Sequence, residues 1–134
     1  ENRLELGSTK PYLDFAGRVF EHRKNIKQLI NDLNNDGKRV MGYGASTKGN
    51  VLLQFCNLTS NDIPYIGEVN SDKFGSYTPG SRIPIISEAE VISMKPDYLL
   101  VLPWHFRDGI IKKEKDYLAS GGKFIFPMPE IEIF

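Results

Sequence analysis

The sequence has little cysteine and no excess charge of either sign. Cys56 is the single cysteine among 134 residues, so no disulfide can form within the chain, and no Cys/His cluster has zinc-site spacing. Lysine plus arginine number 17, and so do aspartate plus glutamate. This balance argues against binding to nucleic acid or to an anionic membrane, because both need a net basic face. We expect no bound metal, a cytoplasmic location that suits a lone thiol, and a core position for Cys56.

The sequence also has no apolar run of transmembrane length and no signal peptide. It begins at Glu1 rather than at a methionine and leads directly into usable sequence, which suggests a piece of a longer protein. The length is close to the commonest size of one domain. We expect a polar linker at residues 1–10 and a single domain at residues 11–134.

A helical pattern begins at Pro11 and continues to about residue 36. Apolar residues recur there at steps of three and four, with charged residues between them. Pro11 suits the first turn of a helix, and Gly37 suits its end. This helix either packs on its own domain or connects to a missing one, and His22 on it is expected to face solvent. The apolar positions are Leu13, Ala16, Phe20, Ile26, Leu29, Ile30 and Leu33.

Beyond residue 37, segments typical of strands alternate with segments typical of helices. The apolar run at 97–102 is typical of a strand buried in a parallel sheet, and Pro84 restricts its own short strand to an edge or an end. Ser87 and Glu90 have the spacing of a capping box. The alternation predicts an α/β fold with a parallel sheet and helices on both faces. Strands are expected at 38–44, 64–69, 83–86, 97–102 and 123–127, and helices at about 51–56, 87–94 and 106–119.

The first expected strand runs into a glycine turn, GYGASTKGN at residues 42–50. Such a turn brings backbone N–H groups and the positive end of a helix to one point, where an anion can bind. The dinucleotide fingerprint G-x-G-x-x-G fails, because Thr47 stands in place of its third glycine. The P-loop pattern fails because Asn50 follows Gly49, so no hydroxyl is placed for magnesium. NTPases and NAD oxidoreductases are therefore disfavoured, although Glu68 stands where dinucleotide folds carry a ribose-binding acid.

The candidate ligand-binding residues lie in the glycine turn or at the carboxyl ends of later strands, where α/β proteins bind ligands. Glu68 either binds a ribose or sugar hydroxyl or ties down the glycine turn. Lys48 either pairs with a phosphate or is a solvated lysine at a helix start, and Asn50 either bonds a sugar or base or braces the loop. We expect no catalytic residue. The candidates are Gly44, Ala45, Ser46, Thr47, Lys48, Asn50, Glu68, Asn70, Lys73, Trp104, His105 and Arg107.

Three of these candidates follow the most buried expected strand, and each has two interpretations. Trp104 stacks on a base or ring, or packs in the core under a helix. His105 has the chemistry of a general base, but a lone histidine without a partner is more often structural or a simple polar contact. Arg107 clamps a diphosphate through two parallel hydrogen bonds, or forms a surface salt bridge.

Four segments, in order along the chain, carry a family resemblance. They are the glycine turn with Leu52 and Leu53, EVNSDKFGSYTPG at 68–80, PDY at 96–98 leading to LPWHFR at 102–107, and GGKF at 121–124 leading to PMPE at 127–130. Together they resemble the C-terminal domain of SAM-dependent nucleotide-sugar C-methyltransferases, which act on deoxysugars carried on a nucleotide, typically dTDP. The resemblance covers the chain from about residue 12 onward. It departs at Glu68 and Val69, where the family often has Asp and Arg, so one charged contact is in doubt.

The resemblance implies a Rossmann-like three-layer domain that carries the long N-terminal helix in addition. It also implies that this domain is one of three parts of an enzyme. The other parts are a small zinc-bearing domain and a SAM-binding methyltransferase domain, and the nucleotide-sugar lies between the latter and this domain. SAM and the catalytic base then belong to the missing domain, so this domain is expected to contact substrate, bind no cofactor and be inactive alone. Two alternatives stay open: a structural or interaction domain with a degenerate Rossmann fold, and a dinucleotide-binding oxidoreductase domain.

Overall fold

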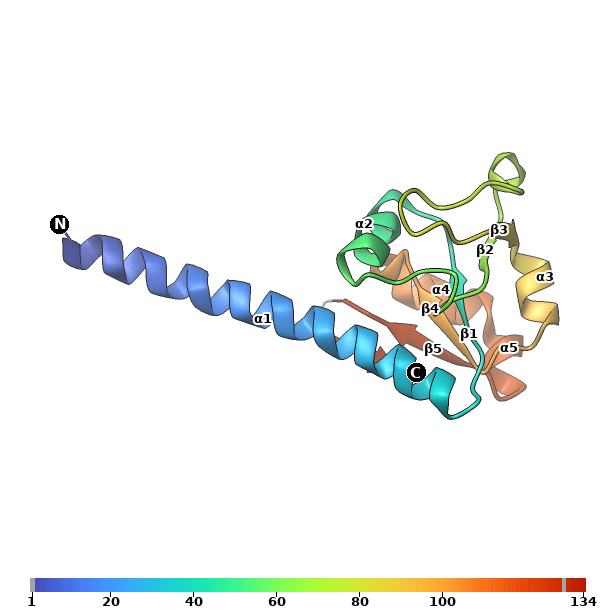
Figure 1. Ribbon diagram of the computed structural model, residues 1–134. Helices are drawn as coiled ribbons and strands as arrows, with labels where there is room; N and C mark the ends of the chain where they lie inside the picture. Colours follow the sequence, from blue (N-terminus) through green and yellow to red (C-terminus); the bar gives the residue numbers. More distant parts are fainter. Residues whose placement is uncertain (1, 129) are drawn as a thin grey trace.

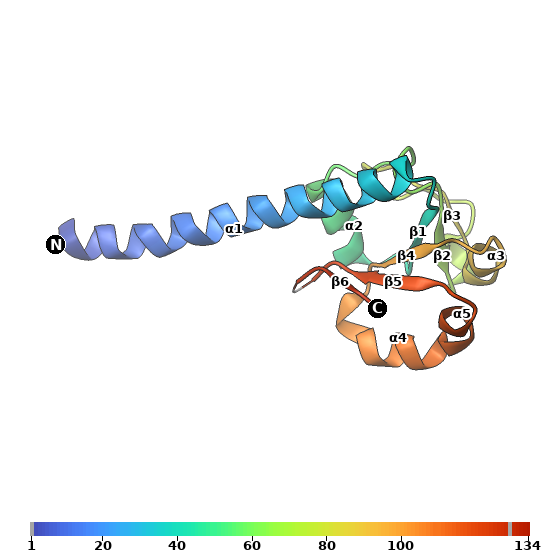
Figure 2. The same cartoon turned by 90° about the horizontal axis from the view of Figure 1, so that it is seen from below.

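A long helix leads into a body built on a six-stranded sheet (Figure 1). The computed structural model describes residues 2–128 and 130–134, and the side chains from residue 17 onward within these ranges. Helix α1 (Asn2–Asn35) ends against the body, while its N-terminal part extends away from the sheet (Figures 1 and 2). The chain therefore has a projecting arm and a sheet body.

Helix α1 begins earlier than the sequence pattern predicted. It includes residues 2–10, which are helical, and Pro11 lies inside the helix instead of in its first turn. Composition gives the physical reason, because leucine, glutamate, arginine and lysine, which all favour helices, are frequent in residues 2–10. Glu1 and the side chains of Leu13 and Ala16 lie outside what the structure describes.

The C-terminal half of α1 ends and packs much as expected. Gly37 has a φ of +77°, and the amide after it bonds back to the last helical turn, so the predicted glycine stop is confirmed. Ile26 and Ile30 are fully buried, whereas Phe20 is 60% exposed, so the apolar stripe packs only over the last turns. The helices in the described part of the chain, α1 included, lack the apolar length needed to cross a membrane.

The remaining elements follow the expected order, with two differences. The helix expected over 106–119 is divided at Glu114, whose φ of −104° and ψ of 31° leave the helical region. A short final strand was not predicted. The capping box is confirmed in part, because Ser87 Oγ accepts a hydrogen bond from the Glu90 amide at 3.1 Å. The elements are β1 (Val40–Tyr43), α2 (Thr47–Phe55), β2 (Ile66–Glu68), η1 (Ser71–Lys73), β3 (Ile85–Ser87), α3 (Glu88–Ser93), β4 (Tyr98–Val101), η2 (Trp104–Phe106), α4 (Arg107–Lys113), α5 (Lys115–Ala119), β5 (Lys123–Phe126) and β6 (Glu132–Ile133).

The sheet has the strand order β3-β2-β1-β4-β5-β6. The first five strands are parallel, as predicted, and β6 runs antiparallel to β5. The prediction of a wholly parallel sheet is therefore wrong at one edge. The physical reason is the connection, because the few residues between β5 and β6 can join antiparallel neighbours but not parallel ones.

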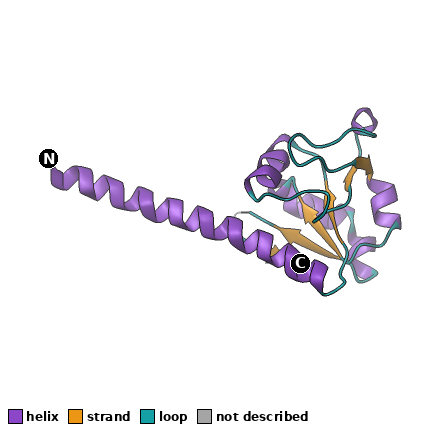
Figure 3. Ribbon diagram, in the orientation of Figure 1, coloured by secondary structure: helices purple, strands orange, loops and turns teal. Residues whose placement is uncertain are grey.

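Buried side chains form two apolar clusters. Figure 3 shows the strands of the sheet in orange, with the helices that surround them in purple. Successive strand residues alternate between the clusters, as in Val40 and Met41, because side chains of a strand point to opposite faces. Helices α1 and α2 contribute to the first cluster, and α3, α4 and α5 to the second. Cys56 lies buried in the first cluster, as expected, and burial raises the pKa of its thiol to about 11.

Strands β1 and β4 are neighbours at the centre of the sheet, and the chain leaves them in opposite directions. From β1 it continues to β2 on one side, and from β4 to β5 on the other. Open α/β sheets bind ligands at the carboxyl ends of the strands where the order reverses in this way. The glycine turn after β1 and the η2 segment after β4 therefore meet at the place where a ligand is expected.

Candidate functional site

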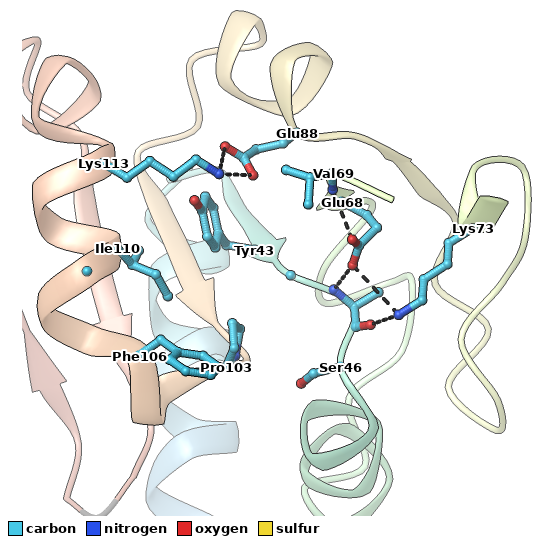
Figure 4. Close-up of a pocket in the computed structure, with 13 residues that line it drawn as sticks. Tyr43, Ser46, Glu68, Val69, Lys73, Glu88, Pro103, Phe106, Ile110 and Lys113 are labelled. Carbon is cyan, nitrogen blue, oxygen red and sulfur yellow. Dashed lines mark hydrogen bonds and ion pairs between the residues drawn. The ribbon is translucent and has the colours of Figure 1, made fainter. Parts of the chain in front are cut away.

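A cavity of about 410 Å³ opens at the carboxyl ends of β1 and β2 (Figure 4). We call it the glycine-turn pocket. The turn at residues 44–46 forms one wall, Glu68 and Lys73 form a second, and α4 forms the third with Ile110 and Lys113. The pocket thus combines residues from segments that are far apart in the sequence.

The glycine turn has its shape for reasons that can be assigned residue by residue. Gly44 has a φ of +81°, a conformation that favours glycine. Ser46 caps α2, because its Oγ accepts a hydrogen bond from the Gly49 amide at 3.0 Å. A Cβ atom on Gly49 would lie 2.5 Å from Leu102 Cβ, so only glycine lets α2 approach the sheet this closely.

Glu68 is buried beside this turn and bonds to three backbone amides. Its Oε1 accepts from the Ala45 amide at 2.9 Å, and its Oε2 accepts from the amides of Val69 at 3.0 Å and Asn70 at 2.8 Å. Of the two roles considered for Glu68, the structure shows that it ties down the glycine turn. Both oxygens of the carboxylate are already engaged with backbone groups.

The loop after β2 folds back onto the same turn. Lys73 Nζ donates to the Ala45 carbonyl at 2.7 Å and lies 4.0 Å from Glu68 Oε1 (Figure 4). Asn70 caps η1 by accepting from the Asp72 amide at 3.1 Å. Lys73 thus lines the pocket, whereas Asn70 shapes the loop beside it.

A group of titratable side chains that the sequence analysis missed lies on the opposite side of the pocket. The Tyr43 hydroxyl donates to Glu114 Oε2 at 3.0 Å, and Lys113 Nζ pairs with Glu88 at 3.2 Å. Burial raises the pKa of the Glu114 carboxyl, and the neighbouring Glu88 raises it further. Burial likewise raises the pKa of Tyr43 well above its usual range, with both carboxylates adding to the effect. Their separation in the sequence left no local signal for this group.

A second cavity, of about 530 Å³, lies between α1, α2 and the η2 segment. We call it the α1–α2 cleft. It is lined by Lys48 and Trp104, and by Arg18 and His22 of α1, so two candidates lie outside the glycine-turn pocket. Trp104 also packs against both apolar clusters. The prediction that His22 faces solvent is wrong, because it is half-buried and its Nε2 bonds to the Pro127 carbonyl.

Two candidates after β4 line neither cavity. His105 is exposed, with its ring 4.3 Å from that of Phe106 between centroids. Arg107 donates to both carboxylate oxygens of Glu132, at 2.8 and 2.7 Å, and to Asp108 at 2.9 Å. These bonds raise the pKa of Arg107 above its already high usual value. The structure therefore shows the surface salt bridge for Arg107 rather than a position in a pocket.

The remaining candidates lie on α2. Thr47 is exposed at the helix start. Asn50 is partly buried, and its Oδ1 has no hydrogen-bond partner among the residues that the structure describes. Five of the predicted residues therefore line the glycine-turn pocket: Gly44, Ala45, Ser46, Glu68 and Lys73. Two more, Lys48 and Trp104, line the α1–α2 cleft.

Within residues 2–128 and 130–134, no group of three or more His, Cys, Asp or Glu side chains has an arrangement that could hold a metal ion. The two carboxylates that line the pocket are instead engaged within the protein, since Glu68 accepts from backbone amides and Glu88 pairs with Lys113.

Comparison with known proteins places these features in a family. The model of the C-methyltransferase C-terminal domain matches residues 1–129. C-methyltransferase NovU of Streptomyces niveus is 42% identical over 119 residues, which are 89% of this chain and 28% of that protein. The chain therefore spans less than a third of the length of this relative.

Proposed function

This chain belongs to the family of C-methyltransferase C-terminal domains, and on that premise we propose that it is the substrate-binding domain of a SAM-dependent enzyme that methylates a nucleotide-linked deoxysugar. The observation that carries the proposal is the glycine-turn pocket at the reversal of strand order. From that order and the two apolar clusters we infer a Rossmann-like, three-layer arrangement, in which this edge is the ligand edge.

The proposal divides the chemistry between this domain and another. Methylation next to a keto group needs a base that removes a proton from the carbon, which then attacks a methyl group. S-adenosylmethionine supplies that methyl when bound. The glycine turn is poorly suited to this cofactor, because Glu68, the acid at the position that would hold its ribose, already accepts from three backbone amides. We therefore assign SAM and the base to a separate domain of the enzyme, and substrate contacts to this one.

The two cavities suit the two ends of a nucleotide-sugar. Apolar Ile110 and polar Tyr43 and Lys113 line the glycine-turn pocket, a mixture that suits a sugar ring with hydroxyl groups. The α1–α2 cleft has an aromatic face at Trp104 and a cation at Lys48, which suit a base and a phosphate. We place the sugar in the pocket and the nucleotide in the cleft, since the residues after β4 line both.

A titration of the chain with thymidine diphosphate and with a dTDP-sugar, followed by backbone amide NMR, tests this placement. We expect thymidine diphosphate to shift the resonances of Lys48 and the Trp104 indole, and the dTDP-sugar to shift Gly44 and Lys113 as well. The same titrations in the complete enzyme cover the case in which the site needs a neighbouring domain. Shifts confined to other surfaces in both proteins would reject the proposal.

A purely structural or docking domain is a second candidate, favoured by the arm that α1 extends away from the body (Figure 1). Kinetics of the complete enzyme separate the two. Substrate binding predicts that Lys48→Ala raises KM several-fold, with the exposed Lys112→Ala as matched control, whereas a docking role leaves KM unchanged. The oxidoreductase alternative loses its main support, because Glu68 is engaged with the backbone. We expect the fluorescence of NADH to show no enhancement when the chain is added to it.

A further inference from the structure

The glycine turn has the shape of an anion site, but the amides of residues 44–46 already have acceptors within the protein. In nucleotide-binding folds, the amides of such a turn and the start of the following helix point at a phosphate. Here the Gly44 amide donates to the Gly67 carbonyl at 2.7 Å, and the Ser46 amide to the Gly44 carbonyl at 3.1 Å. The Ala45 amide donates to Glu68. The turn therefore directs these donors inward, to the protein itself.

The Glu68 carboxylate, which accepts the hydrogen bond from the Ala45 amide, has the features of a bound anion. The Glu68 carboxylate accepts from three backbone amides, of Ala45, Val69 and Asn70, at 2.8–3.0 Å. A cation, Lys73 Nζ, lies 4.0 Å from it. Backbone amides and a lysine are the donors that proteins offer to a phosphate. Glu68 is only 8% exposed, so a ligand that enters the pocket cannot easily displace it.

We propose that Glu68 is a built-in substitute for a bound phosphate, and that it makes the glycine turn exclude phosphate and accept an uncharged part of the ligand. Two effects produce the exclusion. The carboxylate takes the amides that a phosphate would need, and its negative charge opposes a second anion nearby. The nature of the ligand rests on the proposed function, whereas the exclusion of phosphate does not.

The consequence for a nucleotide-sugar is its direction of binding. The diphosphate cannot lie against residues 44–46, as it does in dinucleotide folds. It lies instead toward the cations of the α1–α2 cleft, Arg18 and Lys48, and the sugar points at the turn. Glu68 is thus a residue that determines specificity through the backbone that it holds.

The first experiment uses the unaltered chain and needs no variant. Pyrophosphate is titrated while the amide resonances of Ala45, Val69 and Asn70 are followed by NMR. We expect these three resonances to stay in place up to millimolar pyrophosphate. Saturable shifts of all three would overturn the proposal.

The second experiment removes the carboxylate and asks whether phosphate replaces it. Glu68→Ala leaves three amides and Lys73 around an empty anion position, so inorganic phosphate should bind roughly tenfold more tightly than to the unaltered chain. The Tm of the Glu68→Ala variant should rise with phosphate concentration, and phosphate should shift the amide resonance of Ala45. Glu88→Ala is the matched control, because it removes a charge from the same pocket but no backbone acceptor, and it should gain no such affinity.

A third variant keeps the test decisive if Glu68→Ala does not fold. Glu68→Gln retains the volume and one acceptor but not the charge, so it should also bind phosphate more tightly than the unaltered chain. Equal affinities of all the proteins for phosphate would contradict the proposal.

Failure of the proposed function is distinguishable from failure of this inference. If no dTDP-sugar binds but phosphate binds Glu68→Ala more tightly than the unaltered chain, the proposed ligand is rejected and the role of Glu68 is not. Thymidine diphosphate that binds and shifts the Ala45 amide of the unaltered chain rejects the inference alone.

Discussion

The glycine-turn pocket and the α1–α2 cleft lie at the same edge of the sheet, but their polar groups are engaged differently. In the pocket, Ser46, Glu68 and Lys73 all bond to backbone groups of one turn and its helix. In the cleft, Arg18 and Lys48 are exposed, and none of the ion pairs found across the described part of the chain includes either of them. The pocket is shaped by internal bonds, whereas the cleft offers charge to a ligand.

This difference separates two kinds of polar residue that look alike in a sequence. A buried carboxylate that satisfies backbone amides contributes to stability, because its removal leaves buried donors without acceptors. An exposed lysine contributes little to stability and is available for binding. Substitutions in the pocket should therefore change folding most, and substitutions in the cleft should change binding most.

The largest expected effect is at Glu68. We expect Glu68→Ala to lower the free energy of unfolding by roughly 2–4 kcal/mol, because amides at Ala45, Val69 and Asn70 lose their acceptor and a buried unsatisfied donor costs about 1–3 kcal/mol. Urea denaturation measures it. The exposed Glu90→Ala should change stability by less than about 0.5 kcal/mol. Equal effects of the two variants would show that the backbone bonds of Glu68 do not stabilise the fold.

The next largest effect is at α2, whose N-cap Ser46 lines the pocket and whose Lys48 lines the cleft. Gly49→Ala should destabilise the fold by about 1–3 kcal/mol, because its Cβ would lie 2.5 Å from Leu102 Cβ. Gly109→Ala on α4 is the matched control, since a Cβ there meets no atom within 4 Å, and it should stabilise the fold by about 0.4–1 kcal/mol. Thermal unfolding of both variants gives the comparison, and destabilisation by Gly109→Ala alone would be inconsistent with this packing.

A smaller effect compares two lysines directly. Lys73→Ala should lower the free energy of unfolding by about 0.5–1.5 kcal/mol, because it removes the hydrogen bond to the Ala45 carbonyl. Lys48→Ala should change it by less than about 0.5 kcal/mol while weakening ligand binding. The measurement is urea denaturation of both variants beside a ligand titration. If Lys48→Ala is the more destabilising, the cleft is not the open site described here.

The smallest effect is a pH dependence in the pocket. The pKa of Glu114 is raised in the folded chain, mainly by burial, so its contribution to stability is present below the ordinary value of 4.5 and is lost as the pH rises through the folded value. Glu114→Gln, which keeps an acceptor for Tyr43, should flatten this loss. Tm measured from pH 4 to 7 for both proteins checks the sign.

Glu132 provides a control of opposite sign. Hydrogen bonds from Arg107 lower the pKa of Glu132, so its contribution is present above 4.5 and is lost as the pH falls through the folded value. Glu132→Gln should therefore alter the Tm at neutral pH and leave it unchanged at low pH. If the Tm differences caused by Glu114→Gln and Glu132→Gln change with pH in the same direction, the opposite pKa shifts of the two carboxyls are contradicted.

Local patterns predicted those parts of the fold that depend on neighbouring residues. The glycine stop at Gly37, the Ser87 cap and the buried strand β4 all follow from side chains within a few positions. The start of α1 was wrong, because Pro11 was read as a first-turn residue although the preceding residues favour a helix. The two-residue strand β6 has too little pattern to be recognised.

The site was predictable where the glycine turn carried it, and not beyond. Tyr43 and Glu114 are 71 residues apart, and Arg107 and Glu132 are 25 apart. Such pairs depend on how the strands are ordered, which no local spacing encodes. The hydrogen bond between Tyr43 and Glu114, and the identity of Glu132 as the salt-bridge partner of Arg107, could therefore be seen only in the folded chain.

The sequence by itself determined that the chain is an α/β domain with a glycine turn, and that the turn departs from the dinucleotide and P-loop patterns. It also left the role of Glu68 open between ligand contact and brace. The tertiary structure decided this, because the parallel pairing of β1 with β2 places the end of β2 beside the turn. There the Glu68 carboxylate reaches the Ala45 amide. Hydrogen bonding to a backbone group 23 residues away in the sequence is a property of that pairing, not of the residue type.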